Sequence, residues 1–415
     1  MKRKLDVYLH RHLVGNLVQD AHGQITFDYA ETWLKDPAAI ALSHSLPLTK
    51  KHFSKNECRA FFAGVLPEES KREIVAHNLG ISAKNDYAML EKIGGECAGA
   101  VTFLPAGTEL PKREDSYRAL TDKELAEIVK ALPRRPLLAG DEGVRLSLAG
   151  AQDKIAVHVA GNKISIPLGG SPSTHILKPA IERFEGVVFN EALCMKLARA
   201  IGMNAAHTET GQVEGIDYLL VERYDRTTSS DAPGTAQTLK REHQEDFCQA
   251  LGIVPENKYQ AEGGPSLKQC FALVRDASSA PVIDLQALLD AVIFNFLFGN
   301  HDAHGKNFSL LYAGGQTRLA PLYDLLSTSY YPELSPKMAM KIGGEYLSGK
   351  IIAKHFEQLA EEASLAKPMV RRRVPELAEL ILSKMPAVTA DYPVVLAVAK
   401  LIQRSCDRAI KKFKA

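Results

Sequence analysis

The chain has 415 residues, 46% of them hydrophobic and 24% charged, so it can bury a large core and suits two or three substructures. Its net charge of +2 excludes the strongly basic balance of a protein that binds DNA tightly by itself. The six cysteines are scattered without a C-x-x-C pair, which excludes a recognisable zinc site and is typical of reduced thiols in a cytoplasmic protein.

The N-terminal third predicts a small sheet followed by helices. Alternating apolar residues over 5–29 flank a turn at 20–23 and predict an antiparallel meander. Residues 57–66 and 68–79 predict helices, and residues 99–104 a strand. Residues 105–118 are polar and contain proline, which favours a connector. A further helix is predicted over 121–132, because Thr121 and Glu124 form a capping-box pattern ahead of an apolar face.

From residue 145 the pattern becomes β-rich. Strands are predicted at 154–159 and 163–167 as a hairpin, at 174–178 and at 218–224, with a helix over 190–201. Helices dominate after residue 244. The longest apolar run, 282–298, is interrupted by Asp284, Gln286 and Asp290, so it fits a buried helix better than a membrane span. The first residues lack the apolar segment of a signal peptide, and no membrane association is expected.

The most informative segment runs from residue 300 to 324. A strand at 308–312, a turn at 313–316 and a return strand at 317–323 would bring Asp324 beside Asp302 and Asn307. Kinase-like phosphoryl transfer needs one carboxylate that accepts the proton of the attacking hydroxyl. It also needs an amide and a second carboxylate that hold Mg²⁺ against the nucleotide phosphates. The hairpin therefore predicts an ATP and Mg²⁺ site.

Three features of the β-rich part could serve the same chemistry, and each has a plainer alternative. Lys178 ends a short strand, where it could reach nucleotide phosphates or simply point to water. The small residues before the strand at 154–159 allow backbone N–H groups to approach phosphates, but they match no known glycine-rich motif and could form a plain turn. Residues 221–226 either offer backbone groups to adenine or form a strand end with salt bridges.

Other candidate residues give weaker evidence for a function. His301 and His304 flank Asp302 without a third convergent ligand, so a metal role is not supported, and His304 is expected to support the loop or the nucleotide. Basic residues near the C-terminus are interpreted as solvated faces, with a nucleic-acid or partner contact as the alternative. They are Arg371, Arg372, Arg373, Lys411, Lys412 and Lys414.

Six segments resemble, in order, the HipA family, the serine/threonine-kinase toxins of bacterial type II toxin–antitoxin modules. They are S-L-A-G-A-Q-D-K, T-H-I-L-K-P, V-E-R-Y-D-R, Q-E-D-F-C-Q, H-D-A-H-G-K-N-F-S and P-L-Y-D-L-L-S. Residues 42–48 and 93–102 resemble the N-terminal part of the same family. The resemblance implies a two-lobed, protein-kinase-like α+β fold related to phosphatidylinositol 3/4-kinases. Residues 1–110 would form an extra N-terminal subdomain, residues 111–243 the rest of a β-rich N-terminal lobe, and residues 244–415 an all-helical C-terminal lobe.

The resemblance also implies roles for individual residues, with ATP and Mg²⁺ as cofactors. Asp302 would be the catalytic base, Asn307 and Asp324 would bind the metal, and Ser147 would be autophosphorylated. Lys178 would bind the ATP phosphates. The remaining nucleotide-site residues would be Ala149, Gly150, Ala151, Gln152, Asp153 and Lys154 in the phosphate loop, Glu222, Arg223 and Tyr224 at the adenine, and His304, Gly305, Lys306 and Tyr323 around the metal.

Family members phosphorylate aminoacyl-tRNA synthetases, which stalls translation and causes growth arrest or persistence; glutamyl-tRNA synthetase is the leading candidate substrate. A small helix-turn-helix antitoxin, HipB, would be the partner, and the complex would repress its own operon, with operator DNA contacted mainly through the antitoxin. Two alternatives come from other classes: a small-molecule kinase, and an inactive kinase-fold corepressor. The presence of Lys178, Asp302, Asn307 and Asp324 argues against the second.

Overall fold

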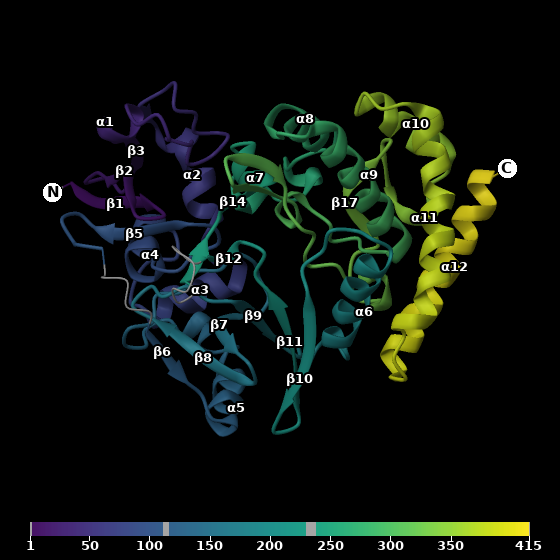
Figure 1. The fold of residues 1–415 in the computed structure, drawn as a ribbon, viewed down its shortest axis with the longest axis horizontal. Coiled ribbons are helices and arrows are strands. Elements are labelled where there is room, and N and C mark those ends of the chain that lie inside the picture. The colour runs from purple at the N-terminus through teal and green to yellow at the C-terminus, as the bar shows by residue number, and fades with distance from the viewer. Residues whose placement is uncertain (1, 111–115, 230–237, 415) are drawn as a thin grey trace. The chain divides into compact units, whose positions relative to one another are not determined.

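The computed structural model describes residues 2–110, 116–229 and 238–414. The chain divides into two compact units (Figure 1), each with helices and strands, so the predicted α+β class is confirmed. Unit 1 comprises Met1–Pro179, Gly211–Glu256 and Leu311–Gly314. Unit 2 comprises Ala180–Thr210, Asn257–Leu310 and Gly315–Ala415.

Unit 1 begins with the predicted meander. Its five-stranded sheet has the order β4-β3-β2-β1-β5, and all neighbouring strands are antiparallel. Alternate residues of the first strand, Leu5, Val7 and Leu9, are fully buried, as the period of two requires. The strands are β1 (Arg3–Leu9), β2 (His12–Gln19), β3 (Ile25–Tyr29), β4 (His52–Phe53) and β5 (Val101–Pro105). The helices are α1 (Glu31–Leu34), α2 (Lys55–Gly64), α3 (Glu69–Asn78) and α4 (Asp86–Ile93).

The second sheet has the order β10-β11-β9-β7-β8-β6, which makes β9 an interior strand. The predicted hairpin is present, because Ala160 of β7 pairs with Lys163 of β8. The last residues of the predicted connector, 116–118, instead belong to edge strand β6, and residues 111–115 lie outside the described residues. The strands are β6 (Ser116–Ala119), β7 (Ile155–Ala160), β8 (Lys163–Leu168), β9 (His175–Pro179), β10 (Thr208–Val213) and β11 (Ile216–Glu222).

Helix α5 (Asp122–Ala131) begins as its sequence predicted. The Thr121 hydroxyl accepts from the Glu124 N–H at 3.3 Å, and the Glu124 carboxylate accepts from the Thr121 N–H at 2.8 Å. Both donors would otherwise be unsatisfied at the first turn, so the capping box defines the start of the helix. Leu125 and Val129 are buried on its inner face.

A cluster of buried charges holds unit 1 together. The Glu96 carboxylate contacts Arg226 at 2.6 Å and Arg223 at 3.2 Å through one oxygen, and Arg241 at 3.2 Å through the other. Arg223 also makes a bidentate pair with Asp225. Burial disfavours the ionised form of Glu96, but the three guanidinium groups outweigh it and hold its pKa below the usual range. We call Glu96, Arg223, Asp225, Arg226 and Arg241 the ion cluster.

The remainder of unit 1 follows the ion cluster along the chain. It contains β12 (Arg226–Ser229), β13 (Thr238–Arg241), β14 (His243–Asp246) and α7 (Phe247–Ala250). The Asp225 carboxylate accepts from the Gly99 N–H at 2.7 Å, so the segment after β11 is anchored to the N-terminal residues. Gly99 has φ +76°, and a Cβ there would lie 2.9 Å from the backbone nitrogen of Gln244, so a side chain at position 99 would not fit.

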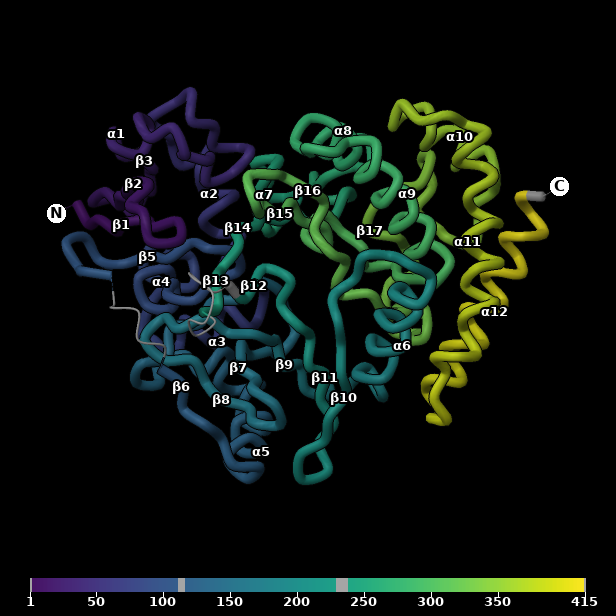
Figure 2. The backbone as a smooth tube through the Cα atoms, in the orientation of Figure 1, coloured from purple at the N-terminus to yellow at the C-terminus, as the bar shows by residue number. Residues whose placement is uncertain are grey.

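Unit 2 contains the longest helices. The apolar run forms α9, which is the one helix among the described residues that is long and apolar enough to cross a membrane by composition. Most of α9 is buried, and it packs against α8, α11 and α12, as predicted for a core helix. Helices α11 and α12 lie side by side (Figure 2). The helices are α6 (Val187–Ala200), α8 (Leu267–Ala277), α9 (Pro281–Phe298), α10 (Ala353–Glu362), α11 (Lys367–Val388) and α12 (Pro393–Lys414).

The strands of this region correct two details of the prediction. The return strand of the hairpin, β16 (Gln316–Leu319), is shorter than expected and pairs beside β15 (Ser309–Ala313). It ends before Pro321, which has no N–H, and the next donor, Leu322, bonds to the Asn204 carbonyl instead. The C-terminal region is also not all-helical, because β17 (Lys337–Ile342) and β18 (Glu345–Leu347) form a second hairpin.

A buried carboxyl group in β14 is expected to make the stability of unit 1 depend on pH. Glu245 is almost fully buried, and its carboxyl accepts from the Ser43 hydroxyl, the His44 N–H and the Tyr312 hydroxyl. Burial raises the pKa of Glu245 to about 7, although these three hydrogen bonds act in the opposite direction. The folded state therefore keeps a proton that the unfolded state loses above pH of about 4.5.

We expect Glu245→Gln to remove this dependence. The stability that the raised pKa contributes is fully present below about pH 4.5 and is lost as the pH rises through about 7. Relative to wild type, the variant should gain up to about 3 kcal/mol of unfolding free energy between pH 5 and pH 8. Denaturant unfolding at both pH values measures this, with Glu127→Gln on the exposed face of α5 as the control. A difference that does not change with pH would contradict the assignment.

Candidate active site

The predicted phosphate loop, residues 149–154, is a half-buried loop that enters β7. Gly150 has φ +104° and donates its N–H to the Glu68 carboxylate at 3.1 Å. Lys154 lies across the loop, and its ammonium group donates to the Ala149 carbonyl at 2.8 Å. Asp153 pairs with Lys71 at 2.6 Å. The loop therefore already donates a backbone N–H to a carboxylate. A nucleotide phosphate would take the place of that carboxylate.

Ser147 is fully buried in this conformation. Its hydroxyl donates to the Val65 carbonyl at 2.8 Å, and its N–H donates to the Glu96 carbonyl at 2.9 Å. No phosphate can reach the hydroxyl while these contacts hold. Modification of Ser147 would therefore require residues 146–150 to leave their place against Glu96 and Val65.

Lys178 lies on interior strand β9, opposite Leu219 of β11. Only 4% of its surface is exposed, so it is not a lysine pointing to water from a strand edge. Lysine is seldom buried without a function or a partner, because desolvation of its ammonium group is costly. Its burial favours the nucleotide role over the plainer alternative.

The predicted adenine segment follows β11 directly. Arg223 is committed to the ion cluster through its side chain, and its N–H donates to the Thr174 carbonyl at 2.9 Å. Tyr224 donates its hydroxyl to the Gln244 side chain. Glu222 is exposed at the end of the strand. The Arg223 side chain is thus structural, which leaves Glu222, Tyr224 and backbone groups for a ligand.

Unit 2 carries Asp302 in the turn after α9. The Asp302 carboxylate is exposed and accepts from the Tyr259 hydroxyl at 2.8 Å. Its carbonyl accepts from the His304 N–H at 2.8 Å. The Tyr259 ring lies edge-on against the His304 ring, with centroids 5.3 Å apart. Tyr259 thus orients both the carboxylate and the imidazole, a role that no motif in the sequence indicated.

Residues 304–307 form a short 3-10 turn over Gly305–Asn307. The Asn307 side-chain oxygen accepts from the His304 N–H at 3.0 Å. Tyr323 donates its hydroxyl to the Lys306 carbonyl at 2.7 Å and lies 2.7 Å from the Ser309 hydroxyl. The hairpin therefore returns Tyr323 to the turn that precedes its first strand.

Asp324 adopts a left-handed backbone conformation, with φ +53°. Among non-glycine residues, aspartate and asparagine tolerate this region best. Asn300 joins this residue to the Asp302 turn, because its side-chain oxygen accepts from the Asp302 N–H at 3.2 Å and its amide lies 3.5 Å from the Asp324 carbonyl. Asn295 accepts from the same amide at 2.8 Å. Asn300 and Asn295 are positioning residues that the sequence reasoning missed.

The site residues thus form two groups. Unit 1 holds the phosphate loop, Ser147, Lys178 and residues 222–224, and unit 2 holds Asp302, residues 304–307, Tyr323 and Asp324. Within unit 2, hydrogen bonds connect the predicted catalytic and metal-binding segments directly or through Asn300. The sequence did contain a signal for the role of Asn300, because this residue directly follows the glycine that ends α9. A side-chain amide at that position can bond to backbone groups on both sides.

The donor set of unit 2 fits Mg²⁺ in chemical type. Asn307 supplies an amide oxygen and Asp324 a carboxylate, and Mg²⁺ binds few protein oxygens while keeping waters and phosphate oxygens. Among the residues that the structure describes, no three His, Cys, Asp or Glu side chains converge to form a metal site of their own. Asn307 and Asp324 would therefore hold the ion together with nucleotide phosphates.

The arginine triplet of α11 does not offer free charge. Arg371 pairs with Glu357, Arg372 with Glu376 at 3.0 Å, and Arg373 with Asp290 at 2.8 Å. The interpretation as a solvated face with paired charges is supported for the triplet. Lys412 donates to the Gly349 and Ile351 carbonyls, and the side chain of Lys414 lies outside the described residues.

The comparisons with known proteins place the chain in the kinase class. The HipA N-terminal domain model matches residues 5–104, and the HipA-like C-terminal domain model matches residues 146–386. The chain belongs to the HipA family of kinases.

Individual relatives agree along the whole chain. The chain is 47% identical to the putative kinase Y4mE of Sinorhizobium fredii, over 94% of this chain and 92% of the relative. It is 30% identical to the serine/threonine-protein kinase toxin HipA of Shewanella oneidensis, over 97% and 95%. A solved structure of the Shewanella HipA, HipB and operator DNA complex matches with a TM-score of 0.86 and 27% identity, covering 99% and 98%.

We expect Ser147→Asp to open the phosphate loop. The carboxylate would be buried against the Val65 carbonyl without a donor, which costs several kcal/mol. Ser147→Ala removes one hydrogen bond and should cost about 1 kcal/mol. Hydrogen exchange of residues 146–154 measures the opening. Equal protection in the two variants would contradict the buried position of Ser147.

Proposed function

We propose that the chain transfers the γ-phosphoryl group of ATP to a serine or threonine hydroxyl. The single observation that carries the proposal is the connected group in unit 2, in which Asn300 joins the Asp302 turn to Asp324. The same hydrogen-bonded segments carry the exposed Asp302 carboxylate, the Asn307 amide and Asp324, the residue types that kinase chemistry needs. The family membership of the chain supports the same activity.

Each residue would do one physical task. Asp302 accepts the proton of the attacking hydroxyl, and the hydrogen bond from Tyr259 orients the carboxylate that receives it. The buried Lys178 and the N–H groups of residues 149–154 bind phosphate oxygens, with Gly150 N–H exchanging the Glu68 carboxylate for the ligand. Glu222, Arg223 and Tyr224 contact adenine, Arg223 through its backbone.

Asn307 and Asp324 would hold Mg²⁺, which when bound neutralises charge on the transferring phosphoryl group. The left-handed backbone of Asp324 places its short side chain at a sharp turn. Hydrogen bonds of Asn300 and Tyr323 stabilise that turn. His304 supports this turn through its N–H bond to Asn307. These residues position charge before the reaction begins, which lowers the reorganisation that the reaction requires.

The substrate and the autophosphorylated residue are proposed from the family membership of the chain. We propose that the substrate is an aminoacyl-tRNA synthetase, with glutamyl-tRNA synthetase as the leading candidate, and that its modification arrests growth in the bacterial cytoplasm. Ser147 would be the autophosphorylated residue. Its burial implies that autophosphorylation takes place from an opened loop and dismantles the phosphate site.

A HipB-like helix-turn-helix antitoxin is the proposed partner, and operator DNA is the proposed target of their complex. The support is the similarity to a solved HipA, HipB and operator DNA complex. The arginine triplet is already paired with carboxylates, and the net charge is only +2, so little of the DNA affinity would come from this chain.

We expect Asp302→Asn to lower the rate of phosphoryl transfer by about 100- to 10,000-fold, the typical contribution of a general base. The asparagine oxygen can still accept from Tyr259, so the turn should keep its shape. Transfer of labelled phosphate from ATP to bacterial lysate proteins measures the rate. Nucleotide affinity provides the control, because it should remain within about threefold of wild type.

The result also separates the alternatives. A small-molecule kinase would label a metabolite pool rather than lysate proteins, and an inactive corepressor would label neither. Wild-type rates in Asp302→Asn would refute the assigned base, whereas loss of transfer in Asp302→Asn with transfer intact in Arg372→Gln would support it.

The isolated chain should bind duplex DNA weakly at physiological salt. A net charge of only +2 predicts that few counterions are released on binding, so the affinity should be no better than about 10⁻⁴–10⁻⁶ M, the range of non-specific binding. Fluorescence anisotropy with operator DNA, with and without the antitoxin, measures this. Tight, sequence-specific binding by the chain alone would show that it carries its own DNA-reading surface.

A further inference from the structure

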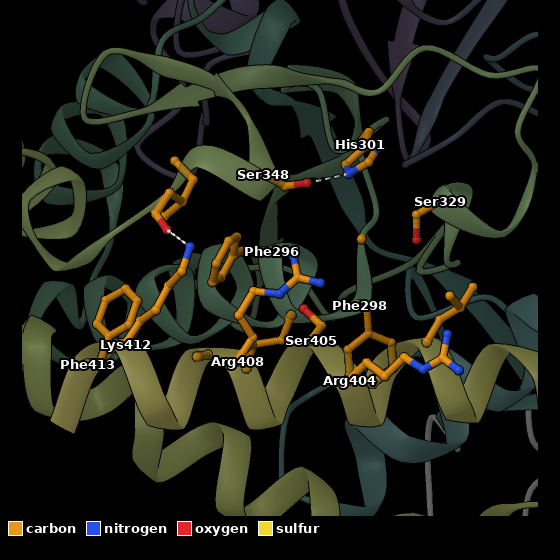
Figure 3. Close-up of a pocket in the computed structure, with 15 residues that line it drawn as sticks. Phe296, Phe298, His301, Ser329, Ser348, Arg404, Ser405, Arg408, Lys412 and Phe413 are labelled. Atoms are coloured by element: carbon orange, nitrogen blue, oxygen red, sulfur yellow. Dashed lines mark hydrogen bonds between the residues drawn. The ribbon is translucent and has the colours of Figure 1, made fainter. Parts of the chain in front are cut away.

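A cavity of about 260 Å³ lies in unit 2 between α12 and the C-terminal end of α9. One wall is α12, which presents Arg404, Arg408 and Lys412 to it. The other includes His301, the residue before the proposed base, and Ser348, which lie 2.9 Å apart. Figure 3 shows the guanidinium of Arg408 reaching from α12 toward this His301–Ser348 pair, with Ser405 beside it.

The charge of the cavity is one-sided. Arg404, Arg408 and Lys412 follow one another at four-residue intervals, so their positions are about 6 Å apart along the helix axis. No carboxylate is among the described residues that line the cavity. Lys412 donates to the Gly349 and Ile351 carbonyls. Within the described part of the chain, Arg404 and Arg408 form no hydrogen bond or ion pair, in contrast to the arginine triplet of α11.

Neutral donors surround the same space. Ser405 lies one turn before Arg408 on the cavity side of α12 and forms no hydrogen bond with any described residue. Ser329 lines the opposite wall, where its hydroxyl lies 3.1 Å from that of Ser327. Gly299 keeps this wall open, because a Cβ there would lie 2.3 Å from the Ser329 hydroxyl. Guanidinium and hydroxyl groups without acceptors, facing one cavity, are the donor set for an oxyanion.

We propose that this cavity binds a phosphate group, either inorganic or carried on a small organic ester, with Arg408 as the central contact and Arg404 and Ser405 beside it. The volume lies below the roughly 300–1,000 Å³ of a drug-sized pocket, which favours a small ligand over a whole nucleotide. The phenyl ring of Phe296, beside Arg408 in Figure 3, offers an apolar surface for the ester part. The proposal does not depend on the kinase function, because none of these residues belongs to the proposed nucleotide site.

Calorimetric titration of the full chain, without ATP or Mg²⁺ and at constant ionic strength, tests the site. The probes are inorganic phosphate, pyrophosphate and glycerol 3-phosphate. Wild type should bind at least one of them saturably, and Arg408→Gln should weaken that binding by about tenfold or more, as loss of a charge-assisted hydrogen bond predicts. Tighter binding of the ester than of phosphate would identify an organic ligand, and the reverse order the free ion; either supports the site.

Arg372→Gln on α11 is the matched control, because it removes the same charge from outside the cavity. It should titrate like wild type, and Arg404→Gln should show a smaller loss than Arg408→Gln. Anion binding at the proposed nucleotide site would survive in all three variants and so would not be mistaken for this one. Equal affinity in Arg408→Gln and wild type, equal loss in Arg372→Gln, or binding of duplex DNA but of no small phosphate would overturn the proposal.

Discussion

The Glu96 carboxylate is the contact on which unit 1 depends most. It is fully buried, binds three arginines and also accepts from the Ser173 hydroxyl and N–H. Its backbone pairs with the other side of the unit, because its N–H donates to the Arg145 carbonyl and its carbonyl accepts from Ser147. One residue therefore joins the N-terminal sheet region, the phosphate loop and the segment after β11. Removing one partner of such a buried pair typically costs about 3–5 kcal/mol.

This arrangement explains how residues 222–224, the predicted adenine segment, are positioned. Buried ion pairs hold them in place in addition to the hydrogen bonds of the sheet. Arg223 and Arg226 leave the end of β11 and turn inward to Glu96 and Asp225, so the chain between them cannot continue the strand. At the end of β11, the groups left for a ligand are then the backbone and the side chains next to Arg223. In the sequence, the charges of residues 221–226 could form surface salt bridges. In the structure, Arg223, Asp225 and Arg226 are buried instead, and they support the candidate adenine segment from the interior of unit 1.

The Asp302 turn of unit 2 depends on a different constraint, the way α9 ends. Gly299 closes the helix at φ +65°, and the next residue, Asn300, then bonds to Asn295, to the Asp302 N–H and toward the Asp324 carbonyl. The end of one helix thus helps to position the backbone of Asp302 and of Asp324, the two candidate site carboxylate residues. The cavity that is proposed to bind phosphate lies at the same helix end, since His301 and Gly299 line it. An anion there would contact the chain one residue from Asp302.

Much of this protein was determined by local sequence. The hairpins, the capping box at Thr121 and the core helix 281–298 follow from periodicity and cap chemistry, which act over a few residues. The set Asp302, Asn307 and Asp324 was proposed from the sequence because a short hairpin joins its members, and its role stays a prediction. Only tertiary structure decided that Lys178 is buried on an interior strand, that Ser147 is enclosed, and that Arg223 is structural. These facts depend on Glu96, Val65 and other partners far away in the chain, and a single sequence carries no local signal for contacts at that separation.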